Sequence, residues 1–395
     1  MTRPSVVIVG GGVMGASAAW HLAARGWRDV LLLEREAGPG RGSTGAATGG
    51  FRAQFGTAIN VRLSLLAQEK LQRFEEETGV DPGYRTAGYL WLAATEGEMG
   101  ALRVGREIQH AEGLLEATEV SVDDVGRLNP AVAPEGVIGG AFCPTDGFIR
   151  PMRLVEGYLS AAERLGVRVE YGVEVTGLDR ETGGRGDRGI GGPITAVRTS
   201  QGAIPTGAVV NAAGPWAARL AEWVGVELPV VPLRRQVAVT APCDLLPENM
   251  PMTIFCGDGF HLRVRDGRIL LLWPTPGVPG DPFNNRLEPE WLDAVVVKAK
   301  TRVPVLRQVA VDRAACYAGL YEMSPDKHAL LGAAPGCENL FLINGSSGHG
   351  VMHAPALGQL LAEIMSDGVA SGLDVTPLRP SRFLEGKPNP VPDLL

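Results

Sequence analysis

Apolar runs near the N-terminus predict two buried strands joined by a helix. Residues 6–9 are continuously apolar, and so are residues 30–33. A continuous apolar run, without polar alternation, is typical of parallel strands that are covered on both faces. Between the two runs, the alanine-rich residues 16–25 have the length and composition of a helix and stop before a glycine. The pattern therefore predicts a βαβ unit at the start of the chain.

Strands and helices of the same kind return in the middle of the chain and near its end. Each predicted helix carries apolar residues at helical spacing or closes at a glycine, and the predicted strands are short apolar or alternating runs. We expect helices over residues 59–78, 153–165, 217–224 and 356–365, and strands over 167–171, 173–178 and 340–343. Residues 208–216 are expected to form a further buried strand that ends in a small-residue turn.

Residues 230–273 follow a different pattern. Alternating or apolar stretches at 236–240, 260–264 and 269–273 are separated by Pro, Gly and Asp, which is typical of antiparallel strands. Another helix is expected over residues 291–301. The proline-rich tail from Asp374 onward is expected to run over the surface.

The two patterns alternate along the chain, which predicts two interleaved domains. We expect an α/β fold with an α+β two-domain organisation, in which a Rossmann-like domain is interleaved with a mainly antiparallel β-sheet domain. The expected boundaries place residues 1–85, 146–225 and 315–385 in the first domain. Residues 86–145 and 226–314 form the second.

The turn after the first strand has the spacing G-x-G-x-x-G, with glycines at Gly10, Gly12 and Gly15. The first permits a tight turn, the second lets backbone approach a pyrophosphate, and the third lets helix and strand pack closely. The helix N-terminus then presents N–H groups to the phosphates. Glu34 follows by about 20 residues, the spacing of a carboxylate that binds a ribose diol. The sequence therefore predicts a dinucleotide site, since an ordinary glycine-rich turn would not account for Glu34.

Composition narrows the classes of function. Of the 395 residues, 45% are hydrophobic and 21% are charged, which is typical of a globular protein with room for two domains. The net charge of −7 disfavours a nucleic-acid partner, which requires a basic face. No apolar run reaches the roughly 18 residues that a membrane span needs. We expect neither a nucleic-acid partner nor a membrane span.

Cysteines and histidines give no indication of a metal site. The five cysteines are scattered without C-x-x-C spacing, which argues against a disulfide framework and a zinc site. His349 and His353 have a spacing that suits a metal on one helix face, but no Glu stands beside His349 and no third ligand is evident. The first apolar run begins too near the N-terminus to leave room for a secretory signal. We expect a cytoplasmic protein without a metal.

Four segments, in the right order, resemble the FAD-dependent amine oxidoreductases of the D-amino-acid oxidase superfamily. They are the glycine turn with Glu34 and residues 42–55, 210–216 and 345–352. The nearer similarity is to sarcosine oxidase, glycine oxidase and the β subunit of dye-linked L-proline dehydrogenase, and it covers almost the whole chain. The resemblance implies that the Rossmann-like domain binds FAD and that the antiparallel domain binds the substrate.

The resemblance assigns a cofactor contact to each segment. Residues 42–55 would run beneath the flavin, and residues 210–216 would lie by its ribityl chain. Residues 345–352 would place a helix N-terminus at the pyrimidine edge, where N–H groups stabilise the negative charge of the reduced flavin. The expected cofactor-binding residues are Gly10, Gly12, Val13, Met14, Gly15, Glu34, Arg35, Ser43, Thr44, Gly49, Gly50, Glu174, Val175, Ala213, Gly214, Trp216, Gly319, Gly345, Gly348, His349, Gly350, Val351 and Met352.

Three residues are expected to act on the substrate. Arg52 matches the position at which sarcosine-oxidase-like enzymes hold a carboxylate, which a planar guanidinium grips with two parallel hydrogen bonds. A surface position or a structural ion pair is the alternative for Arg52. Tyr321 aligns with a tyrosine of the substrate cavity, with simple core packing as its alternative. His261 lies in a predicted cavity strand and is a candidate proton acceptor.

The chain departs from the family pattern at four positions. Gly319 and Ala46 stand where relatives attach their flavin through cysteine or histidine, and Cys316 lies three residues before the first of these. We therefore expect non-covalent FAD. Leu270 and Met352 stand where sarcosine oxidase has lysines, one of which promotes oxygen reduction. A slow reaction with oxygen is expected as a result.

The resemblance implies oxidation of a small amino acid or N-alkyl amino acid of the proline or sarcosine type. Hydride would pass from the carbon next to nitrogen to flavin N5, giving an imine. We favour a dehydrogenase; a true oxidase that produces hydrogen peroxide and a flavin subunit active only within an electron-transfer complex are alternatives. A further alternative is that the chain is an NAD-binding Rossmann protein. The expected partner is a small amino-acid substrate, and a partner subunit or separate electron acceptor is left open.

Overall fold

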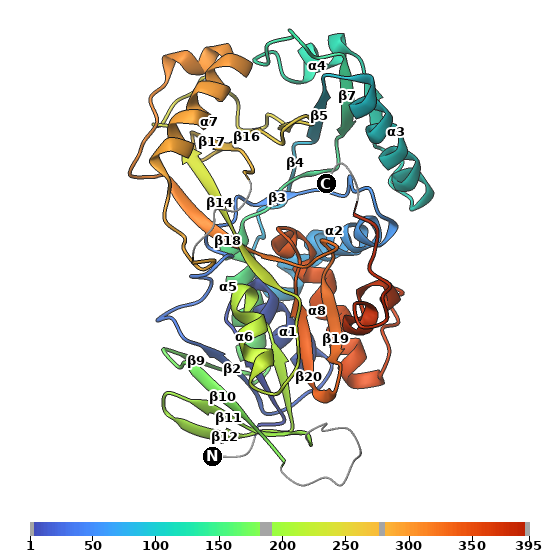
Figure 1. Cartoon of the computed structure of the whole chain (residues 1–395), viewed down its shortest axis with the longest axis vertical. Helices are drawn as coiled ribbons and strands as arrows, with labels where there is room; N and C mark the ends of the chain where they lie inside the picture. The colour runs from blue at the N-terminus through green and yellow to red at the C-terminus, as the bar shows by residue number, and fades with distance from the viewer. Residues whose placement is uncertain (1–3, 182–191, 276–280, 392–395) are drawn as a thin grey trace.

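The computed structural model describes residues 4–181, 192–275 and 281–391, and each half of the structure is built around a large sheet (Figure 1). The lower half in Figure 1 contains the N-terminal strands, and the upper half contains strands from the middle of the chain. The strands β14 and β18 run side by side between the two halves (Figure 1). Among the described residues, no helix combines the length and apolar character that crossing a membrane requires.

A six-stranded sheet forms the centre of the lower half. Its strands from β20 to β9 are parallel to their neighbours, and β19 is antiparallel to β20. In sheet order they are β19 (Leu330–Ala334), β20 (Cys337–Asn344), β13 (Ala208–Asn211), β1 (Val6–Val9), β2 (Val30–Glu34) and β9 (Arg168–Tyr171).

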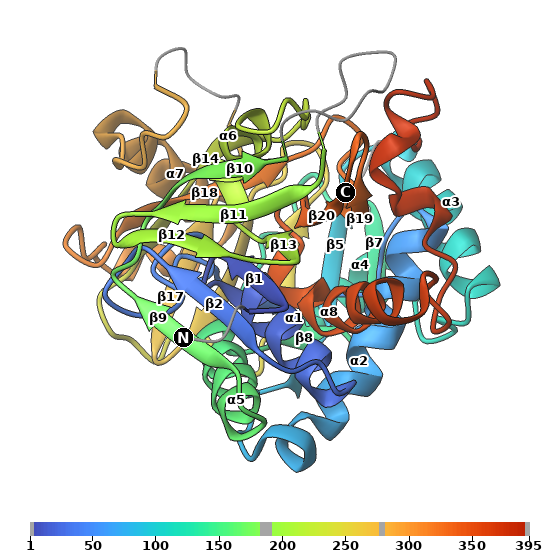
Figure 2. The same cartoon turned by 90° about the horizontal axis from the view of Figure 1, so that it is seen from below.

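Both faces of this sheet are covered, which explains why its strands are continuously apolar. Val6 and Ile8 point into a core shared with four helices, whereas Val7 and Val9 point into a core on the opposite face. Figure 2 shows the helices on one side of β1 and β2 and the three-stranded sheet on the other. The helices of the first face are α1 (Val13–Ala24), α2 (Ala58–Thr78), α5 (Pro151–Arg164) and α8 (Gly350–Asp367); the second face carries α6 (Ala217–Glu222) and the antiparallel strands β10 (Val175–Arg180), β11 (Ile194–Thr199) and β12 (Gly202–Pro205).

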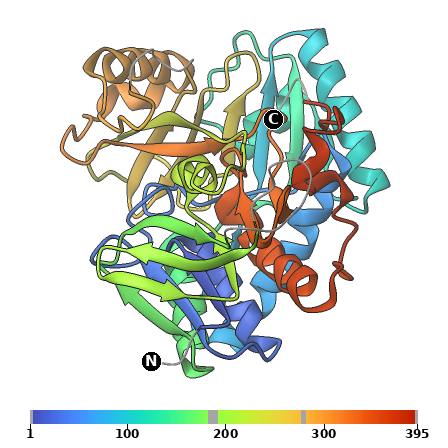
Figure 3. The same ribbon diagram turned by 60° about the horizontal axis from the view of Figure 1, so that its bottom comes forward.

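An eight-stranded sheet forms the centre of the upper half (Figure 3). Adjacent strands in this sheet are antiparallel, except that β15 and β5 are parallel to each other. In sheet order its strands are β18 (Tyr317–Met323), β14 (Val231–Val239), β17 (Arg268–Leu272), β16 (His261–Arg265), β15 (Met252–Phe255), β5 (Tyr89–Ala93), β7 (Gly139–Cys143) and β6 (Thr118–Val120).

Smaller elements complete the structure. Helix α7 packs against β14 and β17, whereas α3 and α4 pack against the other end of the same sheet. A short sheet in the order β3-β8-β4 pairs residues close to Gly50 and Gly147. The bounds are α3 (Glu96–Ala111), α4 (Val122–Leu128), α7 (Pro289–Arg302), β3 (Gly50–Phe51), β4 (Arg85–Thr86), β8 (Gly147–Phe148), and the 3-10 helices η1 (Gly214–Trp216), η2 (Pro304–Gln308), η3 (Thr376–Leu378) and η4 (Pro380–Arg382).

The predicted fold class is confirmed, because a mainly parallel sheet and a mainly antiparallel sheet alternate along the chain. The division into two domains stays a prediction. The strand pairing does not follow the predicted boundary at residue 315. The strand β18 comes after this boundary, yet it hydrogen-bonds to β14 in the eight-stranded sheet. Helix α8 begins at Gly350, six positions before the predicted start at 356. The helices α3 and α4 were not expected.

The C-terminal tail is not confined to the surface, and the expectation for it was wrong. Leu378 and Arg382 are completely buried. The Arg382 guanidinium donates to both oxygens of Asp326, with N–O distances of 2.8 and 2.9 Å. Burial alone would raise the pKa of the Asp326 carboxyl, but hydrogen bonds from Arg382 and Asn389 outweigh it and hold the pKa at about 2. The tail is therefore fastened to the segment that follows β18.

We expect Asp326→Ala to lower the free energy of unfolding by about 3–5 kcal/mol, because it leaves the buried Arg382 charge without its partner. The stabilisation should be fully present above about pH 4, the unfolded pKa of aspartate, and should fade as the pH falls through about 2. Denaturant unfolding monitored by circular dichroism measures it. The control is Asp293→Ala, which removes the exposed pair with Arg313 and should change stability by less than about 1 kcal/mol. Equal effects of the two substitutions would contradict the assignment.

Candidate functional site

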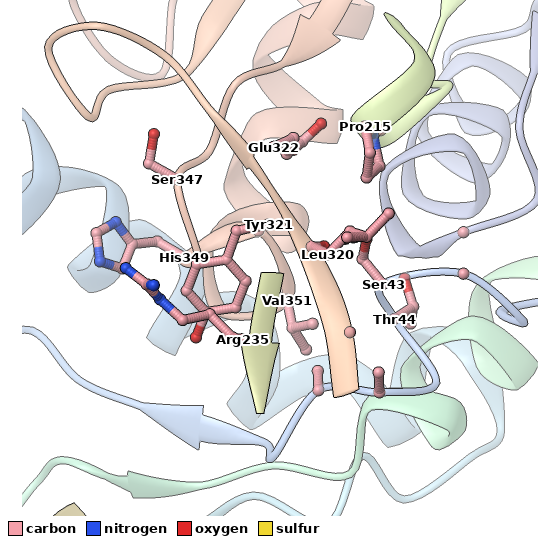
Figure 4. Close-up of a pocket in the computed structure, with 18 of the residues that line it drawn as sticks. Ser43, Thr44, Pro215, Arg235, Leu320, Tyr321, Glu322, Ser347, His349 and Val351 are labelled. Atoms are coloured by element: carbon pink, nitrogen blue, oxygen red, sulfur yellow. Dashed lines mark hydrogen bonds between the residues drawn. The ribbon is translucent and has the colours of Figure 1, made fainter. Parts of the chain in front are cut away.

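A cavity of about 720 Å³ lies where the two sheets meet. The carboxyl ends of β1, β2 and β13 open into it at Gly10, Glu34 and Ala212. Residues of β14, β16 and β18 line it from the eight-stranded sheet. The carboxyl ends of parallel strands are where open α/β sheets bind their ligands. Figure 4 shows part of the lining in close-up.

Glycine at the end of β1 is required by the close approach of other backbone. Gly10 has φ +113°, and a Cβ there would lie 2.4 Å from the Ala212 carbonyl oxygen. A Cβ on Gly15 would lie 1.9 Å from the Gly10 carbonyl oxygen. Gly15 therefore permits helix α1 to pack on the turn. Gly15 was expected to contact the cofactor, but it is not among the residues that line the cavity. Gly10 and Gly12 do line it.

Glu34 is positioned by backbone on two sides. Its Oε2 accepts from the Gly11 N–H at 2.7 Å, and its Oε1 accepts from the Glu36 N–H at 2.9 Å. The carboxylate thereby faces the cavity beside the glycine turn. Each carboxylate oxygen has a further lone pair for an incoming hydroxyl.

Residues 42–50 line another side of the cavity. The Thr44 Oγ1 accepts from the Val13 N–H at 3.1 Å, and the Ser43 hydroxyl donates to the Leu320 carbonyl at 2.5 Å. These two hydroxyls therefore join the segment to the start of α1 and to β18. Gly49 and Gly50 also line the cavity, as expected.

The turn after β13 lines the cavity together with residues from the edge of the three-stranded sheet. Ala213, Gly214, Trp216, Glu174 and Val175 all contribute to the wall.

An aromatic and cationic stack flanks this wall. The Arg35 guanidinium lies 3.9 Å from the centre of the Trp216 ring. The Phe283 ring stacks on Trp216, with 5.6 Å between the ring centres. Arg219 lies over Phe283. Phe283 and Arg219 were not predicted, and only proximity in the fold reveals them.

Helix α8 begins at the cavity. Gly348, His349, Gly350, Val351 and Met352 line it, and the helix N-terminus adds partial positive charge there.

Two further glycines were expected to contact the cofactor with α8. Gly319 of β18 also lines the cavity. Gly345 does not: its φ is +70°, and a Cβ there would lie 2.4 Å from the Leu330 side chain. Gly345 therefore forms a turn that packs against β19, and its contact with the cofactor stays a prediction.

Arg52 is buried in the cavity wall, with 4% of its surface exposed. Its Nη1 donates to the Gln54 carbonyl at 2.5 Å, and its Nη2 lies 3.2 Å from the His349 Nε2. Burial lowers the pKa of Arg52 to about 10, against the opposing effects of nearby tyrosines and Asp146. The guanidinium therefore remains charged at neutral pH. The alternative of a surface arginine does not apply.

Asp146 holds the segment that carries Arg52. Its carboxylate accepts from the Ala53 N–H at 2.6 Å and from the Gln54 Nε2 at 3.1 Å. Burial raises the pKa of Asp146 to about 7, and these hydrogen bonds and the Arg52 charge oppose the rise. Asp146 was not predicted, because it lies more than ninety positions away from its partners in the sequence.

His349 and His261 are both uncharged at neutral pH. Burial holds the pKa of His349 well below its ordinary value, and the Arg52 charge adds to this effect. Burial also lowers the pKa of His261 to about 4. The His261 Nδ1 bonds to the Gly259 carbonyl at 2.8 Å, so that nitrogen carries the proton and Nε2 keeps its lone pair.

Tyr321 lies in the cavity between the two halves (Figure 4). Its ring packs against Gly348, where a Cβ would lie 2.3 Å from the Tyr321 Cε2. The Arg235 guanidinium stands 5.7 Å from the ring centre. Burial raises the pKa of Tyr321, so the phenol is neutral. Arg235 was not predicted, because the alternation in β14 does not reveal which face meets the cavity.

These features fit a dinucleotide with a planar ring. Two helix N-termini, those of α1 and α8, face the cavity and suit anionic groups. The glycine turn excludes side chains where backbone must approach a phosphate, and the Glu34 carboxylate suits a diol. One buried carboxyl oxygen, Oε2 of Glu322, has no hydrogen-bond partner among the described residues. A bound molecule with hydroxyl or N–H donors would supply one.

Comparison with known proteins agrees with this geometry. A family model described as "FAD dependent oxidoreductase" matches residues 5–364. The crystal structure of L-proline dehydrogenase from P. horikoshii superimposes with a TM-score of 0.88 and 27% identity, covering 98% of this chain and 99% of that one. Glycine oxidase from Geobacillus kaustophilus gives a TM-score of 0.81 and 26% identity, covering 96% and 99%.

Two curated relatives are longer proteins. Mitochondrial dimethylglycine dehydrogenase from Rattus norvegicus is 30% identical over 403 residues, which cover 96% of this chain and 45% of the relative. The 4-methylaminobutanoate oxidase (formaldehyde-forming) of Paenarthrobacter nicotinovorans is 28% identical over 394 residues, which cover 97% and 46%. The chain therefore spans about half the length of these relatives.

We expect Gly348→Ala to weaken FAD binding, because the new methyl group would displace the Tyr321 ring from the cavity. Gly26→Ala is the matched control: Gly26 also has a positive φ, +90°, but nothing lies within 4 Å of the position its Cβ would take. Both substitutions should reduce stability by about 1–2 kcal/mol through backbone strain. Fluorescence titration with FAD and thermal unfolding separate the two effects. Equal FAD affinity in the two variants would argue against a tightly packed Tyr321–Gly348 contact.

Proposed function

The chain belongs to the family of FAD-dependent oxidoreductases, and we propose that it oxidises a small amino acid or N-alkyl amino acid of the proline or sarcosine type. Its cofactor is FAD. When bound, FAD accepts a hydride from the carbon next to the substrate nitrogen, and the resulting imine is hydrolysed. The observation that carries the proposal is a buried guanidinium, that of Arg52, in the wall of the same cavity as the glycine turn.

A second cation strengthens the case for an anionic substrate. Arg235 lines the cavity from β14, and burial lowers its pKa. With Arg52 it makes this end of the cavity electropositive, whereas the chain as a whole is negative. A carboxylate is the group that such a pair attracts and orients. Proline, sarcosine and related amino acids all carry one.

The same charges help the substrate amine to lose its proton. An ammonium cannot release a hydride from the adjacent carbon, so the reacting form is the neutral amine. Nearby positive charges disfavour the ammonium and lower its pKa. Tyr321 and His261 are uncharged there, so we assign them hydrogen bonds to the amine, with His261 Nε2 as the acceptor.

We propose that the FAD is held without a covalent bond. Gly319 and Ala46, the positions of attachment in relatives, lie against each other in the cavity wall, since a Cβ on Gly319 would be 2.6 Å from the Ala46 Cβ. The Cys316 thiol donates to the Asp312 carbonyl at 3.2 Å, and Cys316 is not among the residues that line the cavity. FAD should therefore be released by acid or heat.

We favour a dehydrogenase over an oxidase. Leu270 is buried in an apolar cluster with Val237 and Val239, and Met352 lines the cavity. Neither position offers the positive charge that would stabilise superoxide. The rivals are an oxidase that forms hydrogen peroxide and a subunit that works only within an electron-transfer assembly. The named relatives include both oxidases and dehydrogenases, and some are mitochondrial, so a cytoplasmic location also stays a proposal.

We also propose that the two domains bind different molecules. The expected domain of residues 1–85, 146–225 and 315–385 would bind FAD. The expected domain of residues 86–145 and 226–314 would bind the substrate. The cavity lining supports this, since His261 and Arg235 come from the eight-stranded sheet.

Arg52→Ala should weaken substrate binding by about 1.5–3 kcal/mol, the scale of a hydrogen bond to a charged group. Arg52→Lys should recover part of the loss, because it keeps the charge but not the planar fork. KM and kcat with an artificial dye as acceptor, at saturating FAD, provide the measurement. Arg219→Ala is the control, since Arg219 lies over Phe283 in another part of the cavity wall. Unchanged kinetics in Arg52→Ala would refute the assignment.

The substrate and the electron acceptor can be tested on one preparation. Anaerobic mixing with proline, sarcosine, glycine and D-amino acids should bleach the flavin with at least one of them. Stopped-flow mixing of the reduced protein with air and with a dye should then show slow and fast reoxidation, respectively. Rapid reoxidation by air would overturn the dehydrogenase assignment. Failure of every amino acid, in protein purified without partners, would favour the subunit alternative.

A further inference from the structure

Glu322 is a buried acid that the proposed reaction does not use. It lies on β18 directly after Tyr321, and 8% of its surface is exposed. Its Oε1 accepts from the Ser346 N–H at 3.3 Å, whereas its Oε2 accepts no hydrogen bond from any described residue. Glu322 lines the main cavity, and Figure 4 shows its side chain on the Pro215 side, away from Arg235.

The surroundings of Glu322 leave space at its carboxyl group. A Cβ on Gly214 would lie 3.9 Å from Oε2, and a Cβ on Gly350 would lie 3.9 Å from Oε1. Both glycines also line the cavity. The carboxyl group is therefore bordered on two sides by residues without side chains. Oε2 itself is buried and 8% of the residue's surface is exposed, so a ligand would reach the group from the cavity that Glu322 lines.

Burying a carboxyl oxygen without a hydrogen-bond partner costs free energy. Burial raises the pKa of Glu322 to about 7, and the opposing hydrogen bonds come from the backbone and side chain around Ser346. Buried polar atoms in proteins are almost always hydrogen-bonded. The group is thus suited to accept a hydrogen bond that a ligand donates.

Only some parts of FAD can donate such a bond. The phosphates and the flavin carbonyl groups are acceptors and cannot donate a hydrogen bond to Oε2. The donors are the ribityl hydroxyls, the flavin N3–H, the ribose hydroxyls and the adenine amino group. Glu34 already stands at the position suited to the ribose.

The position of Glu322 selects among these donors. It stands between η1 and the N-terminus of α8, at Gly214 and Gly350. Gly350 is also next to the start of α1, because a Cβ there would lie 3.3 Å from the Met14 Cε. The N-terminus of α1 suits the phosphates, and we place the ring beside Tyr321 and the N-terminus of α8. The part of FAD that joins phosphate to ring is the ribityl chain.

We propose that the Glu322 carboxyl group binds FAD by accepting hydrogen bonds from hydroxyls of its ribityl chain. The proposal rests on the cofactor of the family and does not depend on which substrate is oxidised. It assigns a role to a residue that neither the glycine motif nor the expected substrate contacts include.

The test measures FAD affinity of the apoprotein by fluorescence quenching. Glu322→Ala should weaken FAD binding by about 10- to 100-fold, the loss expected when hydrogen bonds to a charged group are removed. Glu322→Gln keeps an acceptor oxygen, so its FAD affinity should lie between those of the wild type and Glu322→Ala. Far-UV circular dichroism of both variants verifies that they are folded, and Glu322→Gln keeps the test decisive if the alanine variant is not.

FAD analogues that lack one ribityl hydroxyl identify the donor. With the analogue that lacks the bonded hydroxyl, wild type and Glu322→Ala should bind with nearly equal affinity, because the contact has already been removed. ADP, which lacks the ribityl chain, should compete equally well in all variants. Wild-type FAD affinity in Glu322→Ala would overturn the proposal. So would an undiminished loss with every deoxy analogue, or a parallel loss of ADP affinity.

Discussion

The site depends on the close approach of three backbone segments at the end of β1. Gly10 touches the end of β13, and Gly15 brings helix α1 against Gly10; neither position has space for even one carbon atom more. Because of this contact, the carboxyl ends of β1, β2 and β13 converge on one cavity and α1 points its N-terminus into it. The other walls are brought to this point by strands from the second sheet.

Much of the fold could be predicted because the signals are local. The continuous apolar runs of β1 and β2 follow from burial on both faces, and the glycine spacing follows from the contacts at Gly10 and Gly15. The helix end at Gly79 likewise follows from its left-handed conformation. By contrast, the burial of Arg382 could not be predicted, because its partner Asp326 lies 56 residues away.

The same distinction applies to the site. Most of the expected cofactor-binding residues line the cavity, since motifs place them at strand ends and helix starts. The missed residues, among them Arg235, Asp146 and Glu322, lie on strands or loops whose orientation depends on pairing with distant segments. The register of β14 against β18, for example, sets Arg235 opposite Gly319. No local pattern contains that information.

The order of the chain has a consequence for biosynthesis. The strand β20 is inserted between β13 and β19 in the six-stranded sheet, and α8 packs between α1 and α2, although both come late in the chain. A nascent polypeptide that has left the ribosome only as far as α7 has made the glycine turn and Arg52 but still lacks β18, β20 and α8. Capture of the flavin must therefore wait until α8 has also left the ribosome.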